Sequence, residues 1–90
     1  MSLSNTELGT SKNITASGNV KNVNGGMIGF YVCSTTAGTI QLYDDAATGT
    51  TLPLTGLITP VMGWNQLPVA FASGLNAVIG GALNVSIVIV

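Results

Sequence analysis

The chain carries very little charge. Only five of its 90 residues are charged at neutral pH, and it has no arginine and no histidine. An ordinary soluble domain is about a quarter charged. Two lysines do not make the basic surface that nucleic acids require, and the absence of histidine removes the commonest general base and metal ligand. We therefore expect no nucleic-acid binding, no metal site, no cofactor and no enzymatic activity.

The few reactive side chains lack neighbours that would activate them. Cys33 is the only cysteine, so it cannot form an intramolecular disulfide. It lies in an apolar run with no positive charge nearby in sequence, which predicts a buried, unreactive thiol. Asp44 and Asp45 form the only carboxylate pair. Because no third carboxylate is near them in sequence, we favour a solvent-exposed turn over a calcium site.

Glycine and proline are frequent, and their spacing leaves no room for an ordinary helix. The longest stretch without either has ten residues, 39–48, whereas a mean helix has about eleven. The runs between them are rich in Val, Ile, Thr and aromatic residues, with the two-residue alternation typical of strands. The alternation predicts about seven short antiparallel strands, at 14–21, 27–33, 39–43, 51–55, 67–71, 75–79 and 83–89.

Turn residues at regular intervals make this pattern typical of an all-β fold, either a small β-sandwich or a barrel. Residues 34–38 are predicted as a hairpin loop and Gly80-Gly81 as a further turn. Residues 1–12 are poor in apolar side chains, so we expect an extended N-terminal arm followed by a single β-sandwich domain at 13–90. Residues 1–12 also lack the basic and apolar regions of a secretory signal, and none is expected.

The C-terminal half has no charged residue after position 45. Its hydropathy over 67–90 is high enough to suggest a membrane-spanning segment. However, this stretch contains proline, glycine and asparagine, and its apolar residues alternate with a period of two. The pattern favours core strands over a membrane helix, and no membrane partner is expected.

Met62 and Trp64 lie in a predicted loop between two prolines. Trp64 is either an exposed contact residue or a plug at one end of the sandwich, and both interpretations stay open. If Trp64 is exposed, a second kind of contact is a sugar ring stacked on the indole, with Asn65 and Gln66 beside it.

The two ends of the chain supply the other candidate interface residues. Val88 and Val90 occupy the side of the last strand that polar residues otherwise hold, so this strand end is either buried on both sides or meets another chain. Leu3 and Leu8 are two apolar anchors in the arm. An extended arm can pair with the sheet edge of a neighbour through backbone hydrogen bonds.

The order of strand and turn motifs resembles that of small tailed-phage virion proteins, of the head decoration or cement type. The resemblance covers residues 13–90 and rests on the runs ITASGNVK at 14–21, GTIQLYD at 38–44, LPVAFASGL at 67–75 and AVIGG at 77–81. It implies a location on the outer capsid surface of the virion. It also implies two partners, the major capsid protein and further copies of the chain, with a trimer favoured over a dimer.

We therefore expect a non-enzymatic structural protein of a bacteriophage virion, which binds and stabilises the assembled head. Low net charge favours association, and many modest contacts repeated by symmetry add avidity. The alternative is a receptor- or glycan-binding β-sandwich module of a tail fibre or an adhesin.

Overall fold

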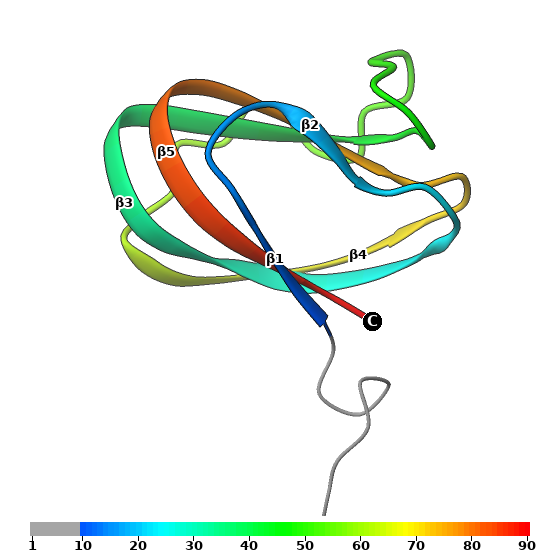
Figure 1. Ribbon diagram of the computed structural model, residues 1–90, viewed down its shortest axis with the longest axis horizontal. Coiled ribbons are helices and arrows are strands. Elements are labelled where there is room, and N and C mark those ends of the chain that lie inside the picture. Colours follow the sequence, from blue (N-terminus) through cyan, green and yellow to red (C-terminus); the bar gives the residue numbers. More distant parts are fainter. Residues whose placement is uncertain (1–9) are drawn as a thin grey trace, which may run out of the picture.

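The computed structural model describes residues 10–90, and all regular elements in this range are strands (Figure 1). They are β1 (Thr10–Ile14), β2 (Gly18–Lys21), β3 (Gly25–Asp44), β4 (Gly63–Phe71) and β5 (Leu75–Ile89). The all-β prediction is confirmed. None of the described residues belongs to a helix that could cross a membrane, and the stretch 67–90 forms the end of β4 and all of β5.

The five strands form one antiparallel sheet in the order β1-β5-β3-β4, with β2 also paired to β5. β1 lies beside residues 85–89 of β5, and β2 lies beside residues 75–77. β3 pairs with β4 through residues 25–32 and with β5 along most of its length. β3 and β5 are therefore the central pair of the fold, and β1, β2 and β4 are its edges.

The two central strands bend at the same level of the sheet. Their ladder is irregular between Thr36 and Thr39, and Thr39 pairs with Gly80. The backbone φ is positive at Ala37 (53°) and at Gly81 (67°). Figure 1 shows β3 and β5 curving together around one end of the molecule. The predicted hairpin loop at 34–38 and the turn at Gly80-Gly81 are therefore wrong, because both are bends inside continuous strands.

The strands number five rather than seven because of these bends, since each half of β3 and β5 resembles a separate strand in the sequence. The predicted strand at 51–55 is part of an irregular connection between β3 and β4. That connection meets β3 through single bridges at Pro53 and Ile58. The predicted strand at 14–21 is divided between β1 and β2, and β1 begins at Thr10, so residues 10–12 of the expected arm belong to the sheet.

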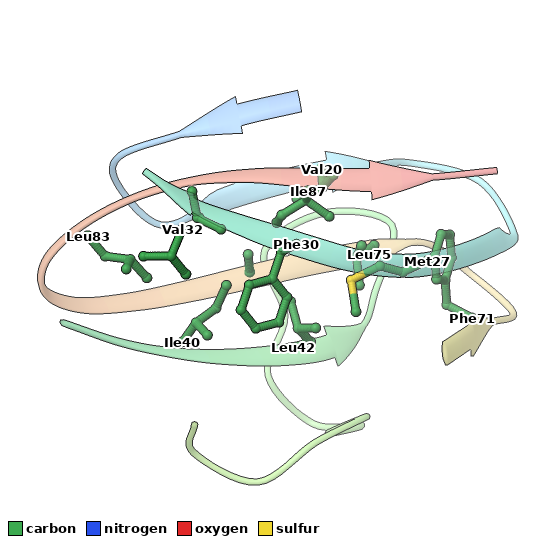
Figure 2. Close-up of a cluster of buried hydrophobic side chains, with 12 residues drawn as sticks. Val20, Met27, Phe30, Val32, Ile40, Leu42, Phe71, Leu75, Leu83 and Ile87 are labelled. Carbon is green, nitrogen blue, oxygen red and sulfur yellow. The ribbon is translucent and has the colours of Figure 1, made fainter. Parts of the chain in front are cut away.

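The bent sheet encloses an apolar core between two layers, which gives the molecule its sandwich character (Figure 2). Phe30 and Val32, from the first half of β3, face Ile40 and Leu42 from its second half, and each is at most 1% exposed. Burying one such side chain is worth roughly 1.5–3 kcal/mol. The other core residues are Val20, Met27, Phe71, Leu75, Ala77, Leu83, Val85 and Ile87.

Candidate functional site

The outer side of the layer formed by β1, β5, β3 and β4 brings together several of the exposed residues. Tyr31 lies opposite Trp64 of β4 on one side and opposite Ser86 of β5 on the other. Ser86 in turn lies opposite Asn13 of β1. We call this surface the neutral face and define it by its outward residues, which are Asn13, Tyr31, Cys33, Trp64, Gln66, Ser86 and Val88.

Two aromatic side chains dominate the neutral face. Tyr31 is 51% exposed and Trp64 is 44% exposed. Residues directly opposite each other in antiparallel strands project to the same side and contact each other. Trp64 was predicted in a loop, but β4 begins one residue before it, at Gly63, whose φ is +91°. Trp64 is therefore a surface residue of the sheet and does not plug the core.

The Trp64 ring lies over Gly29 of the neighbouring strand. A Cβ placed on Gly29 would come within 2.8 Å of the Trp64 Cζ2 atom, which is closer than real Cβ contacts allow. The missing side chain at position 29 thus makes the space in which the indole lies against the sheet. Sequence reasoning found Trp64 but missed Gly29 and Tyr31. The available signal for Tyr31 was its alternation with Phe30 and Val32, which are buried.

The neutral face carries no charged side chain, and its polar groups are neutral amides and hydroxyls. The Asn13 Nδ2 donates to Asn84 Oδ1 (2.7 Å) and to Ser86 Oγ (3.2 Å). The nearest lysine on β1, Lys12, points its Nζ at the backbone oxygen of Asn19 in β2, at 3.1 Å. Its charge is thereby held toward the other layer of the sandwich.

Cys33 is exposed, and its predicted burial is wrong. Its Sγ lies 4.0 Å from the Ser86 Oγ on the neutral face. The run 27–33 is apolar on both sides of the strand, which suggested a strand buried on both faces. Only one side of this run enters the core, through Phe30 and Val32. Tyr31 and Cys33 occupy the side that faces solvent.

The other predicted interface residues lie around this face. Val88 is half-buried within it. Met62 is 59% exposed and immediately precedes β4, while Val90 is 48% exposed and its N–H donates to the Gly26 oxygen at 2.9 Å. Both are therefore surface residues at the margins of this layer. Leu3 and Leu8 lie outside the described residues.

A second group of exposed apolar side chains lies in the connection between β3 and β4. Leu52, Leu57 and Val61 are 59%, 69% and 66% exposed. We call these three residues the apolar connection. The segment that precedes these residues, just after β3, is held by polar contacts. The Asn76 Nδ2 donates to Gly49 O (3.0 Å), and the Asn19 Nδ2 donates to Ala47 O (2.7 Å).

Asp44 and Asp45 both bind backbone N–H groups. The Asp44 carboxylate accepts hydrogen bonds from the amides of the turn between β4 and β5, at Ala72 (2.9 Å), Ser73 (2.8 Å) and Gly74 (3.3 Å). The bonds from Ala72 and Ser73 are the main reason that the pKa of Asp44 lies below its ordinary value. Asp45 Oδ1 accepts from Ala47 N at 2.7 Å within its own turn. Both carboxylates stabilise turns.

The described residues enclose no site. Over residues 10–90 there is no pocket and no group of three or more side chains suited to hold a metal ion. Trp64, Met62 and Val88 from the sequence analysis lie on or beside one layer of the sheet, and Tyr31 and Cys33 join them there. Compared with protein-family models, curated proteins and solved structures, the chain shows no significant match to any of them.

Proposed function

We propose that this protein is a non-enzymatic structural component of a phage virion, which decorates the assembled head by binding the major capsid protein. The observation that best supports a binding role is the weakly charged and partly apolar surface of the sandwich. Eight large hydrophobic side chains among residues 10–90 are exposed. Exposed apolar residues that gather on one surface mark protein interaction sites. The phage assignment itself rests on the resemblance of the strand and turn motifs.

The apolar connection is the proposed contact with the capsid. Leu52, Leu57 and Val61 are the most exposed large hydrophobic residues in the described range together with Met62. Each contact is modest, but the capsid repeats it by symmetry. Binding to the assembled lattice and not to free subunits stabilises the lattice by mass action.

Co-sedimentation with undecorated capsids tests this proposal. The intact protein should bind to saturation, and the double variant Leu52→Ser/Leu57→Ser should bind at least about tenfold more weakly, since 1.4 kcal/mol changes an affinity tenfold. The matched control is Thr59→Ser, a conservative change at an exposed position of the same connection. If the intact protein binds no capsid, the decoration function is wrong.

The arm hypothesis is tested with two truncations. Deleting residues 1–9 leaves β1 complete, and we expect a folded domain with weaker capsid occupancy. Deleting residues 1–12 also removes three of the five residues of β1, so the melting temperature should fall as well. If the shorter deletion binds capsids as tightly as the intact chain does, the arm has no part in docking.

A receptor- or glycan-binding module is the alternative function, and the exposed Trp64 beside Gln66 favours it. Asn65, the other predicted sugar contact, is engaged elsewhere. Its Nδ2 donates to Val61 O (2.9 Å) and Gly63 O (3.0 Å) and so holds the turn before β4. Retention of the protein on immobilised glycans or host envelopes, lost in Trp64→Ala and without any capsid binding, would establish this alternative.

A further inference from the structure

The free edges of the sheet are protected against pairing with another strand. The chain has only two lysines, and Lys12 and Lys21 lie in the edge strands β1 and β2. Pro68 lies in the middle of the edge strand β4, and Pro53 lies in the segment that runs beside the second half of β3. Proline cannot donate to a ladder, and an edge lysine opposes burial beside another strand. Association through these edges is therefore disfavoured.

The neutral face differs from these edges, because it carries no charged side chain that would repel a second copy of the same face. In a twofold dimer the same patch meets itself, so a patch with a net charge would oppose its own pairing. Here the apolar contribution comes from Tyr31, Trp64 and Val88. Gln66 supplies both hydrogen-bond donors and an acceptor, and the Asn13 Oδ1 adds an acceptor, because the Asn13 Nδ2 is already bonded to Asn84 and Ser86. Such a surface complements a second copy electrostatically without any change.

We propose that the neutral face is a homodimer interface, on which a second copy of this chain docks face to face across a twofold axis near Tyr31. Four strands about 4.8 Å apart, with about seven residues each on average at about 3.3 Å per residue, give roughly 450 Å² per copy, since β1 has only five residues and β4 has nine. The pair then buries roughly 900 Å², which lies in the range of weak and transient interfaces. The dimer is therefore weak and depends on protein concentration.

This inference differs from the trimer that the phage resemblance implies. A closed trimer joins two different surfaces of each copy, whereas a twofold dimer uses one surface twice. The neutral face is a single surface, and the edges beside it carry Lys12 and Pro68. The proposal does not depend on capsid binding, so a dimer that binds no capsid would refute the decoration function and leave the dimer interface standing.

Two native probes report on this face. Trp64 is the only tryptophan and Cys33 is the only cysteine of the chain. The experiment measures mass by analytical ultracentrifugation, Trp64 emission and the reaction rate of Cys33 with a thiol reagent, each across a range of protein concentration. We expect the mass to double as the emission shifts to shorter wavelength and Cys33 becomes less reactive. A monomer up to millimolar concentration, a trimer, or a dimer with unchanged probes would overturn the proposal.

A charge swap identifies the occupant of the face as a second copy. Tyr31→Glu and Tyr31→Lys should each raise the dissociation constant of the dimer at least about tenfold, because like charges meet across the axis. An equimolar mixture of the two variants should associate again. The controls are Thr50→Glu and Thr50→Lys, at an exposed position of the connection between β3 and β4. Failure of the mixture to associate would overturn the proposal.

Substitution of Tyr31 can also disturb folding, so a second pair of variants repeats the test. Gln66→Glu and Gln66→Lys place the same charges at an exposed position on the edge strand β4. Circular dichroism of each variant checks the fold before the mixing experiment. Restored association in the mixture supports the proposal, and its absence in folded Gln66 variants counts against it.

Discussion

Asp44 shows how one carboxylate connects segments that are distant in sequence. It ends β3, and its side chain accepts three backbone hydrogen bonds from the turn between β4 and β5. These bonds favour the ionised form, so the pKa of Asp44 is lower in the folded protein than the ordinary value of 3.8. The bonds therefore contribute stability above that ordinary value, and this contribution is lost as the pH falls through the lower, folded value.

The variant Asp44→Asn tests this contribution. We expect it to melt at a lower temperature than the parent protein at neutral pH. We also expect its melting temperature to fall less between about pH 5 and pH 2, since the titrating group is gone. Thermal denaturation at a series of pH values measures both effects. Asp45→Asn is the control, because an amide oxygen can still accept from Ala47 N. Equal pH slopes for Asp44→Asn and the parent would contradict the assignment.

The exposed residues of β3 show what sequence reasoning misses at the residue scale. Met62, Trp64 and Val88 were found because each is an apolar residue at a position where polar ones are expected. Tyr31 and Cys33 were missed because a strand whose residues are apolar on both of its faces has two possible physical explanations. The outer side is either buried by a second layer or exposed to solvent. Only the register of β3 with β4 and β5 decides between them.

At the scale of elements, the bend in β3 and β5 decides the shape of the molecule. Alternation of apolar residues predicted the strands well, because it reflects which side of each strand enters the core. It did not predict which strands are continuous. Gly80-Gly81 suits a tight turn and a bend equally, since both need a positive φ. The pairing of Thr39 with Gly80 makes this position a bend inside a strand and not a tight turn, and these two residues are far apart in the sequence.

The variant Gly81→Ala tests the bend. Its φ of +67° costs an alanine about 1–2 kcal/mol. The new Cβ would also lie 2.9 Å from the Ala37 carbonyl carbon. We expect the melting temperature to fall by about 4–8 °C for each kcal/mol lost. Gly56→Ala is the matched control, because no atom lies within 4 Å of its added Cβ. Equal melting temperatures for the two variants would show that the bend tolerates a side chain.

For the whole molecule, the position of the few charges matters more than their number. Lys12 and Lys21 lie in the two edge strands that pair with β5. Their Nζ atoms also donate to backbone oxygens, from Lys12 to Asn19 (3.1 Å) and from Lys21 to Val90 (3.5 Å). Both lysines therefore hold neighbouring segments together, and they also keep the strand edges soluble.

Replacing both lysines by valine should make the protein aggregate. Lys12→Val/Lys21→Val gives β1 and β2 uncharged, β-branched edges, which favour pairing with other molecules. We expect a shorter lag before thioflavin fluorescence rises in agitated solution. Lys12→Gln/Lys21→Gln is the control, since it removes the charges without adding apolar surface. The same lag in both double variants would mean that lost charge alone, and not the apolar edge, causes aggregation.

The pairing of the bent strands also has a consequence for the folding rate. The nearest contact between β3 and β5 joins Asp44 to Leu75, and it closes a loop of 30 residues that includes β4. From there the ladder must extend past Ala37 and Gly81 together before Met27 reaches Ile89. The long ladder between β3 and β5 therefore waits for the closure of a long loop, which is typical of the high contact-order proteins that fold in milliseconds to seconds. During that interval the uncharged β5 is unprotected, so the chain is most vulnerable to misassembly while it folds.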